Sequence, residues 1–337
     1  MRSTCLLALL LLPGLLVSAS AAEPVRYGGE LQGFAYPHPR QQFALQSQGQ
    51  ALTMVYMDVA PTAASNGRTA VLLHGKNFCG ATWVDTIEVL AGAGYRVIAP
   101  DQIGFCGSSK PRGYQFSFAQ LASHTQALLQ SLQADRVTLV GHSMGGMLAV
   151  RFALMHPQAV EQLVLVNPIG LEDWQAEGVP YATIDTLLAG ERKTSADSIK
   201  AYQLKYYYNG QWAPRYDRWV EMLAGMYAGP DGEVVALNQA QASEMLFTQP
   251  VVHELPRLRM PTVLIIGGKD RTAPGANRAP PELAARLGDY PVLGQRAADA
   301  IPGARLVSFP ELGHSPQVEA PAIFHAALLR ELAAATP

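Results

Sequence analysis

The sequence carries little charge. Of its 337 residues 15% are charged, and 25 Lys and Arg stand against 27 Asp and Glu, for a formal net charge of -2. No basic cluster marks a nucleic-acid-binding face, and no strongly acidic face is present for a basic partner. We therefore expect a substrate that is small or neutral, and no nucleic acid as partner. No feature indicates an oligomeric state.

Motifs for bound cofactors are missing as well. No glycine-rich phosphate loop is found, and no Cys/His group has the spacing of a zinc site. We expect neither a cofactor nor a metal. Hydrophobic residues make up 49% of the chain, which is enough to bury one large core, so a single enlarged domain is predicted.

Long hydrophobic runs are absent too. Residues 1–22 combine a basic start at Arg2, a short apolar run and a small-residue end, the order typical of a secretory signal peptide. The run is shorter than the roughly 20 residues of a spanning helix, and Pro13 interrupts it, so a permanent anchor is the weaker alternative. We expect a secreted or periplasmic protein with no stable membrane span after cleavage.

Cysteine is scarce. Cys5 would leave with the signal peptide, and Cys79 and Cys106 would remain in an oxidising compartment. Composition alone leaves two alternatives open, a disulfide or two separate small apolar residues.

The remaining chain alternates between strands and helices. Residues 23–40 lack periodicity and are interpreted as an N-terminal arm, with ordered structure beginning after it. Two strands joined by a tight turn follow, at 42–46 and 52–58. Later apolar runs without polar alternation indicate strands at 70–73, 96–99, 137–140, 163–166, 262–266 and 305–309. Helical stretches lie between several of them, at 82–93, 117–132 and 144–155, and one closes the chain at 316–333. Such alternation predicts an α/β fold with a mostly parallel sheet of about eight strands.

A helical insert interrupts the strand series after the sixth strand. Residues 171–255 are rich in Trp and Tyr, and divide the predicted core into 41–170 and 256–337. Because the insert follows the carboxyl end of a strand, we expect a cap over the crevice where α/β sheets bind ligands, with a minority of its rings facing the pocket. A second excursion, 278–295, is predicted to be a loop near the pocket rim, with no function assigned.

The strand at 137–140 leads into a motif for nucleophilic catalysis. Gly141-His142-Ser143-Met144-Gly145 is a G-x-S-x-G nucleophile elbow between a strand and an apolar helix. Small neighbours allow the tight turn and the close passage of helix and strand. The helix N-terminus favours a developing negative charge. Ser143 is therefore the predicted nucleophile.

With this motif the chain resembles the α/β-hydrolase fold family, in particular esterase-like members with a cap after the sixth strand. The resemblance covers almost everything from residue 42 to residue 332. It implies an acid after the next strand and a histidine after the last. Asp270, a few residues before Pro274, and His314, in Gly313-His314-Ser315, fill these places in the expected order. His314 would be the general base, and Asp270 would orient it.

The stretch His74-Gly75-Lys76 after the third strand resembles the His-Gly motif of the same family. The resemblance implies that the backbone N–H groups of Lys76 and Met144 form the oxyanion hole. It also implies that His74 is structural and that the Lys76 side chain points to solvent or pairs locally. It also places Cys79 in the oxyanion loop and Cys106 in the loop after the neighbouring strand, close enough for the disulfide that we predict between them. Cys106 is a departure from the family, which usually has glycine at that place.

These residues favour hydrolysis of a carboxylic ester through an acyl-enzyme, with the aromatic cap favouring an apolar acyl or alcohol group. Lactonase, aminopeptidase, carbon-carbon bond hydrolase and perhydrolase chemistry are alternatives on the same triad. A non-catalytic ligand-binding homologue is a weaker alternative, because all three triad residues are present. An aminopeptidase would use acids of the cap to hold the substrate amine. The candidates, which we interpret as solvated helix surface, are Glu172, Asp173, Glu177 and Glu191.

The other histidines lack a catalytic motif and are interpreted as packed or solvated side chains. They are His38, His124, His156, His253 and His325. For His253 a second interpretation stays open, in which it lines the pocket, because it stands at the end of the cap.

Overall fold

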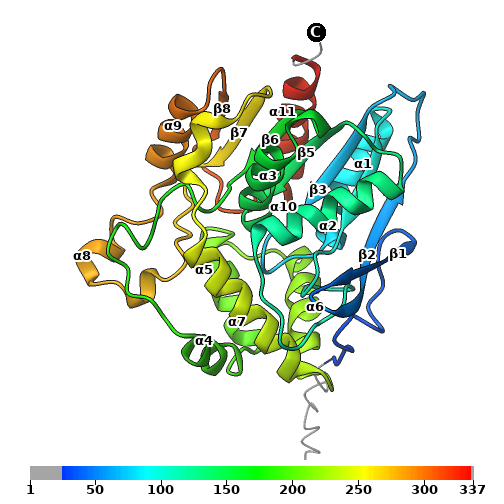
Figure 1. Cartoon of the computed structure of the whole chain (residues 1–337). Coiled ribbons are helices and arrows are strands. Elements are labelled where there is room, and N and C mark those ends of the chain that lie inside the picture. Colours follow the sequence, from blue (N-terminus) through cyan, green and yellow to red (C-terminus); the bar gives the residue numbers. More distant parts are fainter. Residues whose placement is uncertain (1–24, 335–337) are drawn as a thin grey trace, which may run out of the picture.

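A computed structural model describes residues 25–334, so the predicted signal peptide lies outside the described residues. The core is one sheet of eight strands in the order β1-β2-β4-β3-β5-β6-β7-β8 (Figure 1). The strands are β1 Arg40–Ser47, β2 Gln50–Val59, β3 Thr69–Leu73, β4 Arg96–Pro100, β5 Val137–His142, β6 Val160–Val166, β7 Thr262–Gly267 and β8 Arg305–Phe309. β2 pairs antiparallel with β1 and β4, and every other pair is parallel. The predicted α/β fold with a mostly parallel eight-stranded sheet is confirmed.

Helices cover both faces of the sheet (Figure 1). One apolar cluster joins the strands to α1 (Val84–Gly92) and α11 (Pro321–Ala334). The other joins them to α2 (Phe118–Ser131), α3 (Met144–Met155) and α9 (Tyr290–Ala300). All residues of β5 are buried, as expected for a central strand covered on both sides. The elbow after β5 therefore starts from a rigid strand.

The helical insert lies between β6 and β7 and sits beyond the carboxyl ends of the parallel strands (Figure 1). Its helices are α4 Ile184–Glu191, α5 Ala196–Tyr206, α6 Asp217–Ala228 and α7 Gly232–Thr248. α4 packs against α7, and α5 packs against α6. Many of the cap's aromatic rings are buried among one another; Tyr208 and Tyr216, for example, stack with centroids 3.7 Å apart. The predicted helical insertion after the sixth strand is confirmed.

The described part of the N-terminal arm contains no helix or strand before Arg40, but several of its side chains are anchored to the rest of the chain. Leu31 is fully buried. The Tyr27 hydroxyl donates to Glu221 of α6 at 2.7 Å, and the Tyr36 hydroxyl donates to Asp101 in the core at 2.5 Å. The arm thus connects cap and core through single anchoring side chains, a kind of packing that leaves no periodicity in the sequence.

Two predicted segments differ from the structure in detail. The excursion at 278–295 is partly helical rather than a plain loop, because η5 (Ala276–Arg278), α8 (Pro281–Ala284) and α9 occupy it. Proline stands in the first turn of α8 and of α9, where its missing N–H costs no hydrogen bond. The closing helix is split into α10 (Pro316–Glu319) and α11, because Pro321 disfavours helical backbone at the residue before it.

Short 3-10 turns complete the chain at η1 Gly80–Trp83, η2 Pro157–Ala159, η3 Pro214–Tyr216 and η4 Val252–Arg257. No helix within residues 25–334 combines the length and apolar character that crossing a bilayer requires.

Candidate active site

Ser143 stands at the sharp turn between β5 and α3. Its backbone is strained, with φ 55° and ψ -120°. A Cβ placed on Gly145 would lie 2.2 Å from the backbone oxygen of Leu73, at the end of β3. Only glycine therefore lets the start of α3 approach β3 this closely. This approach brings the loop after β3 alongside Ser143, where the oxyanion hole is predicted.

Asp270 and His314 meet at the same edge of the sheet. Asp270 follows β7 and His314 follows β8, and the Oδ2 and Nδ1 atoms are 2.6 Å apart. Both side chains are fully buried. Asp270 also accepts hydrogen bonds from the Thr272 amide at 2.7 Å and from Nδ2 of Asn167 at 2.9 Å. The carboxylate is thus fixed from three sides and holds Nδ1 of the imidazole in its donating tautomer.

His142 connects Ser143 to His314. Its Nε2 donates to the His314 carbonyl at 2.9 Å, and the two rings are 4.9 Å apart. Burial, together with the neighbouring His314, lowers the pKa of His142 well below its ordinary value, so His142 stays neutral. Nε2 of His314 is buried without a hydrogen-bond partner among the described residues. The predicted base therefore has a free lone pair, and no hydrogen bond joins it to Ser143 among the described residues.

The loop after β3 lies against the elbow. A Cβ on Gly75 would be 3.0 Å from the Cβ of Ser143. The N–H groups of Lys76 and Met144 donate to no backbone acceptor within residues 25–334. Met144 begins α3, where the first N–H groups have no partner inside the helix. Two unused donors thus lie close to Ser143, as an oxyanion hole requires.

His74 is held by backbone groups on both ring nitrogens. The Gln102 amide donates to Nε2 at 3.0 Å, so Nδ1 carries the proton and donates to the Gly75 carbonyl at 2.9 Å. Burial lowers the pKa of His74. A neutral ring with both nitrogens occupied shapes the loop and takes no part in proton transfer.

The structure contains the disulfide Cys79–Cys106, with Cα atoms 5.7 Å apart. Asp101 ties the same two loops together by accepting from the amides of Gly80 at 2.7 Å and Gly107 at 2.9 Å. Among the described residues, His74, Asp101 and Cys106 are the group close enough together to suggest a metal. All three are engaged with protein partners, so we assign no metal site to them.

A comparison with known proteins agrees with this geometry. The sequence profile described as alpha/beta hydrolase fold matches residues 70–321. The chain belongs to the α/β-hydrolase fold family. A crystal structure of a probable hydrolytic enzyme from Pseudomonas aeruginosa is 58% identical to this hydrolase and covers 92% of it and 98% of its own chain, with a TM-score of 0.90.

More distant relatives have names that specify a reaction. A 2-hydroxy-6-oxononadienedioate/2-hydroxy-6-oxononatrienedioate hydrolase from Paraburkholderia xenovorans is 31% identical over 63% of this chain and 74% of its own length. A 2-hydroxy-6-oxo-2,4-heptadienoate hydrolase from Pseudomonas putida is 34% identical, but the match spans 34% of this chain and 42% of that protein, less than half of its length. An esterase from Exiguobacterium antarcticum, 22% identical over 86% of this chain and 98% of its own, shares the fold with a TM-score of 0.66.

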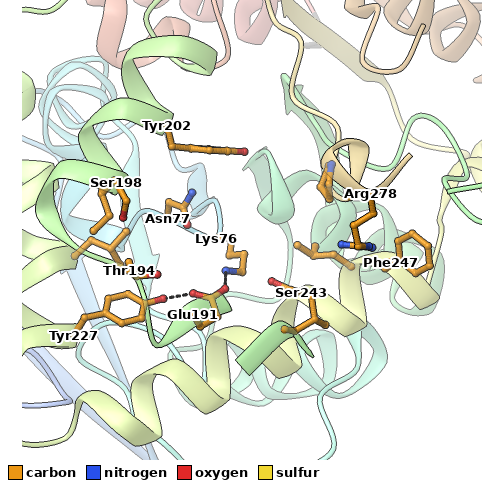
Figure 2. Close-up of a pocket in the computed structure, with 16 residues that line it drawn as sticks. Lys76, Asn77, Glu191, Thr194, Ser198, Tyr202, Tyr227, Ser243, Phe247 and Arg278 are labelled. Carbon is orange, nitrogen blue, oxygen red and sulfur yellow. Dashed lines mark hydrogen bonds and ion pairs between the residues drawn. The ribbon is translucent and has the colours of Figure 1, made fainter. Parts of the chain in front are cut away.

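The hydrolase has a pocket of about 330 Å³ between the oxyanion loop, the cap and the loop after Asp270 (Figure 2). Its walls are partly apolar, with Leu187, Ile199, Leu223, Leu246 and Phe247 among the lining residues. Three of the cap's aromatic residues, Tyr202, Tyr227 and Phe247, line the pocket. Arg278, from the second excursion, lines it too, which agrees with the predicted place of that segment near the rim.

Tyr207 packs against the base, and neither Ser143 nor His314 is among the residues that line this pocket. Its ring lies 4.7 Å from the His314 ring, and its hydroxyl accepts a hydrogen bond from Nδ2 of Asn77 at 3.0 Å. Asn77 itself lines the pocket. The sequence alone did not single out Tyr207, because the cap contains several other Tyr and Trp residues nearby and no motif distinguishes Tyr207 from them.

The interpretation of the cap acids as solvated surface is wrong for Glu191. Lys76 Nζ donates to its Oε1 at 2.9 Å, the Tyr227 hydroxyl donates to its Oε2 at 2.5 Å, and the side chain is 16% exposed (Figure 2). Burial disfavours the charge, but Lys76 and the hydrogen bonds from Tyr227, Lys76 and Ser243 hold the pKa of Glu191 below its ordinary value. The Lys76 side chain therefore pairs with the cap and does not point to solvent.

The other cap acids do not line this pocket. Glu172 accepts from Trp174 and from the Gly288 amide, and Glu177 is exposed. The solvated-surface interpretation is also wrong for Asp173, whose side chain is 16% exposed and bonds His253 at 2.8 Å. His253 is not among the residues that line the pocket beside the oxyanion loop.

Proposed function

We propose that this hydrolase cleaves carboxylic esters through an acyl-enzyme on Ser143. The observation that carries the proposal is the buried Asp270–His314 hydrogen bond of 2.6 Å, which leaves Nε2 of His314 free beside the strained elbow of Ser143. A free serine hydroxyl is a weak nucleophile, and a fixed neutral imidazole is the group that activates it.

In the proposed acylation, His314 Nε2 takes the proton of Ser143 Oγ as the oxygen attacks the ester carbonyl carbon. The carbonyl oxygen gains negative charge and binds the N–H groups of Lys76 and Met144, each worth about 3 kcal/mol in the transition state. The imidazolium, stabilised by Asp270, then protonates the departing alcohol. Water attacks the acyl-enzyme with His314 as base, which releases the carboxylic acid and restores Ser143.

Hydrolysis of a carbon-carbon bond is the second candidate. The relatives from Pseudomonas putida and Paraburkholderia xenovorans are named as hydrolases of 2-hydroxy-6-oxo dienoates and dienedioates. The aminopeptidase alternative has less support, because Glu191 is the cap acid that lines the pocket and Lys76 already neutralises it.

We also propose a periplasmic or secreted location, in keeping with the signal-like start of the sequence. The disulfide supports it, since such bonds persist in oxidising compartments.

Initial rates on p-nitrophenyl esters from acetate to decanoate test the function, with wild type measured beside Ser143→Ala. We expect activity that the variant loses by at least about 1000-fold. A folded wild type that leaves every ester intact but cleaves a dienoic diketone contradicts the ester proposal and supports the second candidate.

A further inference from the structure

The pocket beside the oxyanion loop differs in charge from the chain as a whole. The chain has a formal net charge of -2, but the charged residues that line the pocket are Lys76, Glu191 and Arg278. Lys76 and Glu191 form an ion pair at 2.9 Å and neutralise each other. The guanidinium of Arg278 is left as the net charge of the pocket.

Arg278 is held in place without a carboxylate. Its Nε donates to the Pro180 carbonyl at 3.0 Å, and its guanidinium lies 5.2 Å from the centre of the Phe247 ring (Figure 2). No acid pairs with it in the part of the chain that the structure describes, and its two terminal nitrogens donate to no acceptor there. Burial without a compensating charge lowers the pKa of Arg278, which an anion in the pocket would offset.

The positive character continues next to the pocket. A second hollow of about 720 Å³ shares Tyr202, Pro274 and Gly275 with it, and its charged lining residues are Lys205 and Arg271. Arg271 pairs with Asp289 at 3.7 Å, so the positive charge of this hollow comes mainly from Lys205, which lies over the Tyr206 ring. No acidic residue lines this hollow. An anionic ligand approaching from this side therefore meets favourable charge.

We propose that Arg278 determines specificity by binding a carboxylate at the end of the acyl chain, so that the substrate is a monoester of a dicarboxylic acid. This inference rests on the proposed ester hydrolysis. Arginine offers paired N–H groups whose geometry matches a carboxylate, and Phe247 limits the orientations of its plane. The apolar residues between Lys76 and Arg278 contact the methylene chain. Because the carboxylate belongs to the acyl part of the substrate, it stays bound to Arg278 in both the acylation and the deacylation step.

The test compares esters that differ in one terminal group. Monoethyl succinate, glutarate and adipate are paired with ethyl butyrate, pentanoate and hexanoate, in which a methyl group replaces the carboxylate, and hydrolysis is followed by pH-stat titration. Wild type is expected to prefer at least one anionic ester by about tenfold or more in kcat/KM, and to lose the preference at high ionic strength.

The variants are Arg278→Gln, Arg278→Lys and the control Arg286→Gln, an exposed arginine of the same segment outside the pocket. Arg278→Gln should lower kcat/KM for the preferred anionic ester by about 10- to 100-fold and leave its neutral partner within about twofold. Arg278→Lys should be intermediate, and Arg286→Gln should match wild type.

A wild type that hydrolyses neutral esters with no preference for any anionic partner overturns the anchor and leaves the ester function intact. An equal loss on both esters in Arg278→Gln also overturns it, because Arg278 would then only hold Pro180 and Phe247. If no ester is hydrolysed, the proposed function fails. Calorimetry of monoethyl adipate with Ser143→Ala then still decides the anchor, which requires binding that Arg278→Gln removes.

Discussion

Replacing Cys79 and Cys106 by alanine measures what the disulfide contributes to stability. The bond closes a loop with a sequence separation of 27 residues. On the chain-entropy relation, opening this loop lowers the free energy of the unfolded chain, and with it the free energy of unfolding, by about 3.5 kcal/mol. Both cysteines are buried, so the loss of sulfur packing adds to that figure. Because the free energy of unfolding of a typical domain is about 5–15 kcal/mol, the variant should be much less stable but still folded.

The assay is urea unfolding followed by the fluorescence of the four tryptophans. Wild type reduced by a thiol is the matched control, since it loses loop closure but keeps both sulfur atoms. We expect a fall of about 3–4 kcal/mol in the reduced protein and somewhat more in the alanine variant. Falls below about 1 kcal/mol in both would refute the loop-closure reasoning. Activity of the folded fraction should stay within a few-fold, because Asp101 still holds the two loops through Gly80 and Gly107.

Three further outcomes follow from single side chains. Asp270→Asn should lower kcat by roughly 10⁴-fold with an unchanged circular dichroism spectrum, since the amide favours the wrong imidazole tautomer; a loss under tenfold would contradict its orienting role. Gly145→Ala should give insoluble or inactive protein, because its Cβ would lie 2.2 Å from the Leu73 carbonyl oxygen, whereas Gly92→Ala, with nothing within 4 Å, should behave like wild type. Burial lowers the pKa of His124 from 6.5 to about 4. Between these two pKa values the unfolded chain binds a proton at His124 that the folded protein does not bind. The free energy of unfolding is therefore highest above pH 6.5 and falls by about 3 kcal/mol as the pH is lowered to 4. Urea unfolding at pH 7 and pH 4.5 should show that the free energy of unfolding falls less in His124→Gln than in wild type. Equal falls in the two proteins would contradict this.

The strands, and the loops after them that carry Ser143, Asp270 and His314, could be predicted from local patterns and from the family resemblance. A strand buried on both faces is a mostly apolar run without polar alternation, and β3 to β7 each contain one. Ser143 lies in a motif with a fixed strand-turn-helix context. Asp270 and His314 follow strands whose order is that of the family, so the resemblance sufficed to place them.

The supporting residues could not be predicted, because they depend on which distant segments become neighbours. Asn167 bonds Asp270 across 103 positions of sequence, which happens because β6 pairs with β7. Its signal, an amide directly after a buried strand, is weak in isolation. Glu191 and Lys76 are 115 positions apart and meet only once the cap has folded over the oxyanion loop. Glu191 looks like helix surface in sequence because its partners lie on other elements.

The central claim is that Ser143 is the nucleophile, and covalent trapping tests it most directly. Folded wild type is incubated with a fluorophosphonate, and intact mass and peptide mapping locate the adduct, with Ser143→Ala as control and His314→Ala to remove the base. We predict one adduct per chain, on Ser143, that is absent in the first variant and formed far more slowly in the second. A folded wild type that stays unlabelled, or carries the adduct on another residue, would contradict the assignment.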